Sequence, residues 1–184
     1  MKVVWLTDIE KMRIAQMPDP TIKKPNEVLI RMKKVGICGS DVHYYKTGQI
    51  GEQRVDFPFV PGHEGAGIVE QVGKAVSRVK TNSRIAFDPA VYCNECDQCE
   101  DGRPNTCRNL KFLGCPGQMQ GCLSEYIVLP EDSCFPLNDN ITLKQAVLSE
   151  PLAIGHYAVS LSLISSWHKI AILGAGPVGL SVLV

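Results

Sequence analysis

The chain has 184 residues, of which 45% are hydrophobic and 21% are charged, so it is long enough to bury a core as one or two globular domains. Nineteen lysines and arginines balance nineteen acidic residues, which leaves no electrostatic footprint for nucleic acid or a membrane surface. We therefore expect a small-molecule partner, and neither a nucleic-acid nor a membrane partner.

Short apolar segments separated by turn residues make up most of the chain before about residue 150, and this pattern predicts β-strands. The expected strands cover residues 27–33, 67–72, 83–87 and 124–129. From Leu143 the apolar residues recur at helical spacing, which predicts helical turns before Trp167. A buried strand at 169–173 is then expected to lead into a glycine-rich turn and the start of a helix.

Four cysteines follow a Cys-x2-Cys-x2-Cys-x7-Cys pattern in a turn-rich stretch: Cys93, Cys96, Cys99 and Cys107, here called the four-cysteine set. A closed set of soft thiolates suits zinc, a d¹⁰ ion without a geometric preference of its own. Since the protein supplies all four ligands, no position is left for a substrate. The pattern therefore predicts a structural zinc site.

Two other interpretations of these cysteines are weighed against zinc. Disulfides are typical of secreted chains, but the early apolar run, Val3 to Leu6, is soon interrupted by Asp8, Glu10 and Lys11 and does not resemble a secretory signal. An iron–sulfur cluster is the closer rival, because its motifs use similar short spacings. Eight cysteines without such a signal favour a reducing compartment, and the cytoplasm is the expected location.

The last residues, 170–184, are almost wholly apolar, yet they are too few and too rich in glycine to span a bilayer. They contain a Gly-x-Gly-x-x-Gly pattern after an expected strand, the context in which such a turn binds a dinucleotide pyrophosphate at a helix N-terminus. A glycine-rich turn without a ligand remains the alternative. The residues expected to contact the cofactor are Gly174, Gly176, Pro177, Val178 and Gly179.

A second group of metal-binding residue types lies in three separate segments. Cys38 lies in Gly-Ile-Cys-Gly-Ser-Asp-Val-His, His63 and Glu64 lie in Pro-Gly-His-Glu-Gly, and Glu150 lies in Ser-Glu-Pro. A thiolate, an imidazole and one or two carboxylates suit a catalytic zinc that keeps a position for water or substrate. Each residue alone is more often a core or surface residue, and their spacing does not join them.

These motifs together resemble the zinc-dependent medium-chain alcohol dehydrogenases, in the order in which that family carries them. The segment from Gly36 to Tyr44, with Ser-Glu-Pro-Leu at 149–152, looks most like the polyol branch of sorbitol, xylitol and L-iditol dehydrogenases. In that branch a glutamate replaces the second cysteine of liver-type alcohol dehydrogenases, as Glu150 does here. The resemblance covers essentially the whole chain.

The resemblance implies a role for each residue of the site. Cys38 and His63 would bind the catalytic zinc, and Glu64 and Glu150 are both candidates for the third ligand, one of them acting through a water. Asp41 resembles the carboxylate that orients the zinc-bound histidine. A further set completes the implied site, with a proton relay at Ser40 and His43 and a substrate-pocket wall at Tyr44, Phe112 and Leu113.

The fold implied is a mainly β GroES-like catalytic domain over residues 1–150 with a zinc lobe at about 89–112, followed over 151–184 by a linking helix and the start of a Rossmann domain. The implied reaction moves a hydride between a polyol or other secondary alcohol and NAD or NADP, with two zinc ions per chain. The chain looks like the first half of an enzyme of ~350 residues that forms a dimer or tetramer.

Two alternatives to this function stay open. A stand-alone zinc-stabilised scaffold or binding domain would need no open metal site, so the second group of residues argues against it. A zinc dehydrogenase acting on threonine, butanediol or a sugar phosphate differs only in details of the pocket.

Overall fold

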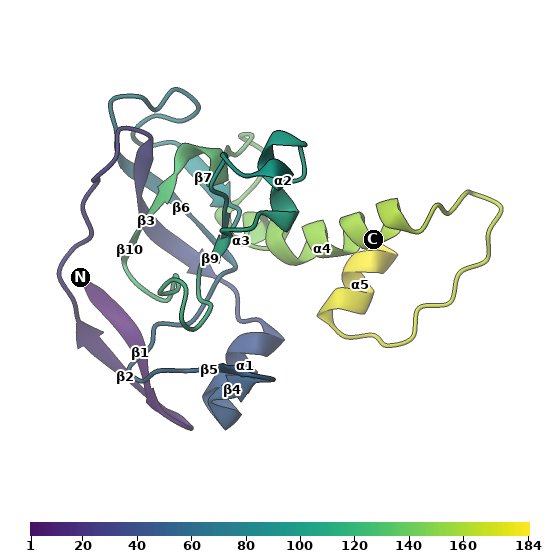
Figure 1. The fold of residues 1–184 in the computed structure, drawn as a ribbon, viewed down its shortest axis with the longest axis horizontal. Helices are drawn as coiled ribbons and strands as arrows, with labels where there is room; N and C mark the ends of the chain where they lie inside the picture. Colours follow the sequence, from purple (N-terminus) through teal and green to yellow (C-terminus); the bar gives the residue numbers. More distant parts are fainter. The chain divides into compact units, whose positions relative to one another are not determined.

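A computed structural model describes all 184 residues. The chain divides into two compact units, an N-terminal unit, Met1–Val147, and a C-terminal unit, Leu148–Val184. The N-terminal unit carries the strands, and the C-terminal unit is helical (Figure 1).

The centre of the N-terminal unit is a five-stranded antiparallel sheet with the order β10-β3-β6-β7-β11. Its strands are β3 (Glu27–Val35), β6 (Gly65–Val72), β7 (Arg84–Phe87), β10 (Tyr126–Pro130) and β11 (Cys134–Pro136). The strands predicted at 27–33, 67–72, 83–87 and 124–129 correspond to four of these, and their existence is therefore confirmed with small shifts at the ends.

Alternation along these strands directs one set of apolar side chains into the core. In β3, for example, Val28 and Ile30 are fully buried, while Leu29 between them is half-buried. The main cluster combines side chains from the sheet, from the loop between β6 and β7 and from the loop after β9: Val28, Ile30, Val69, Val79, Ile85, Phe87, Leu113, Cys122, Ile127, Leu129 and Cys134.

A hairpin of β1 (Lys2–Asp8) and β2 (Lys11–Gln16) packs beside the sheet. The backbones of Leu6 and Phe59 exchange two hydrogen bonds of 2.8 and 2.9 Å, and the Val4 N–H donates to Leu123 O at 2.8 Å. These bonds fix the segment that leads from Phe59 toward His63. Leu6 and Phe59 also share a second apolar cluster with Tyr44 and Val55.

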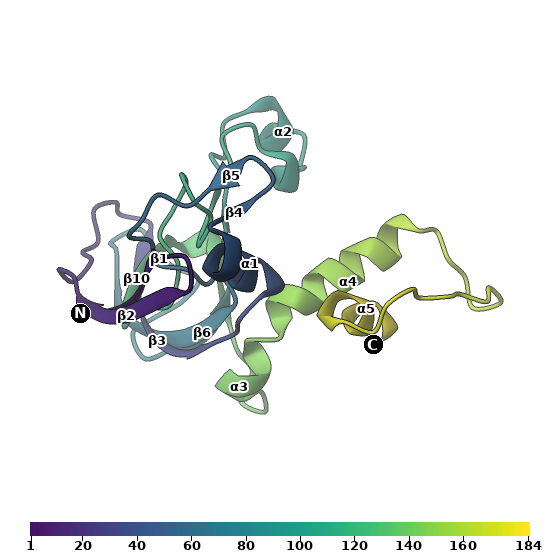
Figure 2. The ribbon, with the colours of Figure 1, turned by 90° about the horizontal axis from the view of Figure 1, so that it is seen from below.

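Short elements complete the N-terminal unit. They are α1 (Gly39–Thr47), β4 (Gln49–Ile50), β5 (Gln53–Arg54), β8 (Ala90–Val91), α2 (Asp97–Glu100), η1 (Pro104–Thr106), β9 (Lys111–Phe112), η2 (Glu131–Ser133) and α3 (Leu143–Ala146). In the view of Figure 2 the segment around α2 stands away from the central strands. It belongs to the excursion between β8 and β9, two strands that pair with each other.

The C-terminal unit contains α4 (Ser149–Leu161) and α5 (Pro177–Leu183). Pro151 is tolerated in α4 because it lies in the first turn, where its missing N–H is not needed. The prediction of a strand at 169–173 is wrong, because these residues form no strand in the structure. The physical reason is that a strand needs a hydrogen-bonded neighbour, and this unit consists of helices and connecting segments. The helices are all too short or too polar to span a bilayer.

One glycine contact positions the loop before β6. Gly114 has φ +72°, and a Cβ atom at this position would lie 2.4 Å from the carbonyl oxygen of Gly62. Only glycine allows the two backbones to approach this closely. Gly117 has a similar φ of +76°, but a Cβ atom added there would face open space. A substitution of Gly117 therefore measures the cost of the left-handed backbone conformation alone.

We expect Gly117→Ala to lower the free energy of unfolding by about 1–2 kcal/mol, the cost of a left-handed conformation for a residue with a Cβ atom. Gly114→Ala should lower it by at least about 1 kcal/mol more, because the backbone must also move. Urea unfolding of the two variants measures the difference. Equal losses would show that the approach to Gly62 is not tight.

Candidate metal centres

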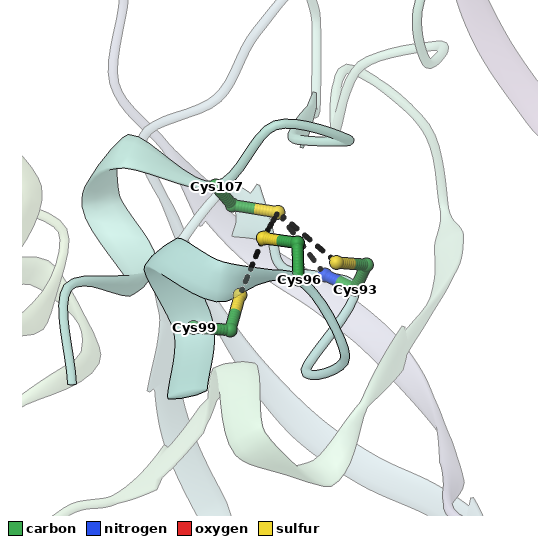
Figure 3. Close-up of side chains that lie close together, drawn as sticks. All are labelled: Cys93, Cys96, Cys99 and Cys107. Carbon is green, nitrogen blue, oxygen red and sulfur yellow. Dashed lines mark hydrogen bonds between the residues drawn. The ribbon is translucent and has the colours of Figure 1, made fainter. Parts of the chain in front are cut away.

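The four-cysteine set converges on one point within the excursion between β8 and β9 (Figure 3). The sulfur of Cys107 lies 3.5 Å from that of Cys93 and 3.9 Å from that of Cys96, and the Cys96 and Cys99 sulfurs are 3.6 Å apart. Four sulfurs placed tetrahedrally at about 2.3 Å from a zinc ion would be about 3.8 Å apart. The set therefore fits a single tetrahedral ion.

Backbone N–H groups favour charged sulfurs in this set. The N–H groups of Arg108 and Cys99 lower the pKa of the Cys96 thiol to about 6, and that of Glu95 lowers the pKa of Cys93. Desolvation and a neighbouring thiol raise the pKa of Cys99 to about 12. A bound cation would instead lower the pKa of the Cys99 thiol, because thiols that coordinate a metal ion are deprotonated.

The second group forms where two central strands meet. Val35, at the end of β3, pairs with Gly65, at the start of β6, and the Gly36 N–H donates to Glu64 O at 2.8 Å. This register brings the residues that follow β3 beside those that precede β6. The ligand atoms of Cys38, His63 and Glu64, here called the Cys38 set, all lie within 4.8 Å of one another.

Asp41 holds the two halves of the Cys38 set together. Its carboxylate accepts hydrogen bonds from the Cys38 N–H at 3.0 Å and from the Gly62 N–H at 2.9 Å, and it is only 2% exposed. The first bond also caps the N-terminus of α1. The Nδ1 atom of His63 is 3.9 Å from Asp41, too far for a direct hydrogen bond, so the carboxylate positions the histidine through its loop.

Glu64 packs over a glycine. A Cβ atom on Gly36 would lie 2.2 Å from a carboxylate oxygen of Glu64, so a side chain here would displace the carboxylate. Burial raises the pKa of Glu64, while the neighbouring His63 and a hydrogen bond with Cys38 act in the opposite direction. A cation between these three groups would therefore offset the cost of burying the charged carboxylate of Glu64.

The residues predicted for the proton relay lie on α1. Ser40 and His43 are three positions apart, so they are neighbours on the helix surface. Ser40 is half-buried and His43 is exposed, an order that leads outward from the helix start to solvent. Their function as a relay stays a prediction.

The predicted pocket residues differ in their surroundings. Tyr44 is buried, and the ring of Phe112 lies 5.5 Å from that of His63. Leu113 is buried in the main core cluster, so its role as a pocket wall stays a prediction. A cavity of about 520 Å³ between the N-terminal hairpin and the 119–128 segment contains none of the predicted zinc ligands.

Sequence reasoning missed two residues close to this site, Gln53 and Cys115. Gln53 forms hydrogen bonds with Tyr44 and with Cys115, at 2.7 Å in each case. Gly114 and Gly117 mark the turn that holds Cys115, but a single glutamine in a two-residue strand gives no sequence signal.

The remaining predicted site residues belong to the C-terminal unit. Glu150 is half-buried in the first turn of α4, and its place among the zinc ligands stays a prediction. Gly174 has φ +114°, and Gly176 caps α5, which begins at Pro177. A Cβ atom on Gly179 would lie 2.0 Å from Gly174 O, so this glycine does allow close packing of the turn against the helix. Contact with a dinucleotide stays a prediction for the whole segment.

The family model of the alcohol dehydrogenase GroES-like domain matches residues 24–139 of this sequence. These residues contain the central sheet, the Cys38 set and the four-cysteine set. This match covers more than half of the chain. The chain therefore belongs to the alcohol dehydrogenase GroES-like domain family.

Three relatives illustrate the range of similar proteins. A probable D-xylulose reductase A from Aspergillus fumigatus is 39% identical over 175 residues, which are 95% of this chain and 49% of the relative. A solved putative zinc-binding dehydrogenase from Sinorhizobium meliloti bound to NADP is 32% identical with a TM-score of 0.84, over 98% of this chain and 51% of that one. The solved 2R,3R-butanediol dehydrogenase from Bacillus subtilis is 33% identical with a TM-score of 0.84, over 99% of this chain and 53% of that one. The chain spans about half the length of these relatives.

We expect the protein to bind two zinc ions per chain, because two separate sets of ligand atoms converge. Cys93→Ser should remove the zinc of the four-cysteine set and Cys38→Ser that of the Cys38 set, each lowering the zinc content by one ion. Elemental analysis after dialysis measures this. Cys115→Ser, in a cysteine outside both sets, is the matched control and should retain both ions.

A chelator should remove the zinc of the Cys38 set first, because a four-thiolate site is closed and the other keeps an open position. Loss of both ions at the same rate, or a wild-type content of one ion that survives Cys93→Ser, would contradict the assignment of the two sets.

Proposed function

We propose that the complete protein is a zinc-dependent dehydrogenase that interconverts a polyol or other secondary alcohol with its ketone, using NAD or NADP. The observation that carries this proposal is the convergence of Cys38, His63 and Glu64 in a domain of the alcohol dehydrogenase family. A thiolate, an imidazole and a carboxylate are ligands that zinc accepts, and three ligands leave room for a substrate oxygen. A purely structural scaffold would have no use for such an incomplete set.

In this proposal each residue of the N-terminal unit has a defined task. When bound, zinc supplies a Lewis acid that lowers the pKa of an alcohol hydroxyl. Cys38 and His63 would hold the ion, and Asp41 fixes the two backbone segments that carry them. Ser40 accepts the proton of the substrate hydroxyl and passes it to His43, which is exposed and can release it to solvent. Phe112, beside His63, excludes water from one side.

The cofactor assignment rests on the glycine-rich turn. Gly174, Gly176 and Gly179 would let a pyrophosphate approach the backbone before α5, and hydride would pass from the substrate carbon to the nicotinamide. A dinucleotide-bound relative, the dehydrogenase from Sinorhizobium meliloti, supports this part of the proposal.

The candidate ligands and the relatives support this substrate class. Carboxylate ligands such as Glu64 and Glu150 make a zinc site harder than a second thiolate would, which suits a substrate with several hydroxyl oxygens. The named substrates of two relatives, D-xylulose and 2R,3R-butanediol, both have adjacent oxygen-bearing carbons.

We expect the complete protein to oxidise xylitol or sorbitol with a kcat/KM roughly 10-fold or more above that for ethanol, because a site built for hydroxyl groups rejects an analogue without them. Formation of the reduced nicotinamide measures the rates. A higher kcat/KM for ethanol would remove the polyol assignment but keep the dehydrogenase class. No oxidation of any alcohol by zinc-loaded protein would contradict the proposed function itself.

The relay is tested separately. Ser40→Ala should lower kcat by roughly 100-fold, the lower range for loss of a proton-transfer group. Ser77→Ala, a serine in an exposed loop, is the matched control and should behave as wild type. Equal rates for the two variants would show that the proton leaves by another path.

A further inference from the structure

The residues that lead into His63 run beside another stretch of the N-terminal unit, residues 121–123, here called the support segment. All three of its residues donate their backbone N–H groups to carbonyl oxygens of residues 60–62: Gly121 to Val60 at 2.6 Å, Cys122 to Gly62 at 2.9 Å and Leu123 to Pro61 at 3.1 Å. Gly121 has no room for a side chain, because a Cβ atom there would lie 2.2 Å from Pro61 O. The two stretches of backbone are therefore in close contact just before the candidate ligand His63.

The backbone of Gly62 is held from two directions. Its N–H donates to the buried carboxylate of Asp41 at 2.9 Å, and its carbonyl oxygen accepts the N–H of Cys122. Gly62 has φ +99°, a conformation that residues with a Cβ atom rarely adopt. The residue before His63 thus combines an unusual conformation with hydrogen bonds at both of its polar backbone groups, so the direction in which the chain enters His63 is closely defined.

The side chain of Cys122 extends this support past His63. Its sulfur would lie 3.3 Å from a Cβ atom on Gly62, and it lies 3.9 Å from the carbonyl oxygen of Glu64. At 3.9 Å the thiol is at most a weak donor, so the contact acts mainly through packing. One buried sulfur therefore lies against the residues on both sides of His63, although Cys122 belongs to neither metal set.

Another cysteine shows the same kind of burial away from the metal ligands. Cys134, in β11, is also fully buried, belongs to the same main core cluster, and has its sulfur 3.6 Å from a carbonyl oxygen, that of Pro130. Pro130 lies at the end of β10 and is not next in the sequence to any member of either metal set. The two cysteines thus match in burial and in type of contact, and they differ in what their sulfurs pack against.

We propose that Cys122 is a positioning residue for the Cys38 set: its sulfur packs against the backbone of residues 62–64 and thereby keeps His63 and Glu64 in the arrangement in which they bind the metal. A smaller side chain would leave space into which these residues can move. Loss of a group that orients metal ligands typically weakens metal binding by about 10- to 100-fold. This inference rests on the proposed function, because it concerns the metal centre to which that function assigns the alcohol, but its test needs no turnover.

The test measures the binding of cobalt(II), because this ion accepts the same ligands as zinc and its visible absorption reports their geometry. A chelator first removes the zinc of the Cys38 set from the complete protein, and elemental analysis shows that the zinc of the four-cysteine set remains. Cobalt is then titrated into the wild type, Cys122→Ala and Cys134→Ala. We expect Cys122→Ala to bind cobalt roughly 10-fold more weakly than the wild type and with shifted absorption bands, and Cys134→Ala to match the wild type in both respects.

Urea unfolding of the same preparations, before cobalt is added, separates positioning from a general loss of packing. Both alanine variants should lower the unfolding midpoint, because each removes a fully buried sulfur from the same core, whereas only Cys122→Ala should change the cobalt site. Unchanged cobalt binding in Cys122→Ala, equal weakening in Cys134→Ala, or a wild-type Cys38 set that takes up no cobalt would overturn the proposal. If an alanine variant does not fold, Cys122→Ser and Cys134→Ser make the same comparison with a smaller loss of volume.

Failure of the proposed function would give a different result. A protein whose Cys38 set binds cobalt, and is weakened by Cys122→Ala but not by Cys134→Ala, supports the role of Cys122 whether or not it oxidises an alcohol. If such a protein oxidises no alcohol, only the proposed function is contradicted.

Discussion

The buried carboxylate of Asp41 is the contact on which the Cys38 set depends. One residue accepts N–H groups from Cys38 and from Gly62, so it joins two segments that carry ligands and are distant in the sequence. A buried carboxylate without such donors would be very costly, whereas charge-assisted hydrogen bonds to N–H groups are among the stronger ones in proteins. The geometry of the two loops is therefore fixed by the same bonds that make burial of Asp41 tolerable.

The two metal sets are built in different ways. The four-cysteine set comes from one short excursion, and its ligands approach one another through local turns and a short helix. The Cys38 set needs the central sheet, because the pairing of Val35 with Gly65 brings its segments together. The close approach of Gly114 to Gly62 fixes one of these segments. Damage to the sheet should therefore disturb the Cys38 set before it disturbs the four-cysteine set.

This difference also explains what the sequence could predict. The spacing of Cys93, Cys96, Cys99 and Cys107 was sufficient to predict that their sulfurs converge, and alternation was sufficient to predict β3 and β6. Cys38, His63 and Glu64 could be joined only through family resemblance, because sheet register brings them together. The strand predicted at 169–173 has the right composition, but strand formation depends on a partner that composition does not specify. Gln53 gave no sequence signal, because its hydrogen bonds with Tyr44 and Cys115 depend on how separate segments of the chain fold together.

The contacts that support the metal ligands are separate from the hydrogen bonds of Gln53. The zinc ligands are tied to the register of β3 and β6 and to Asp41, so substitutions there disturb the metal. Gln53 lies on a two-residue strand outside the central sheet, and its amide touches Tyr44 and Cys115 but belongs to neither metal set. A substitution of Gln53 therefore breaks none of the hydrogen bonds by which Asp41 joins the segments of Cys38 and Gly62. The metal ligands and the buried Tyr44 are thus supported by different parts of the N-terminal unit.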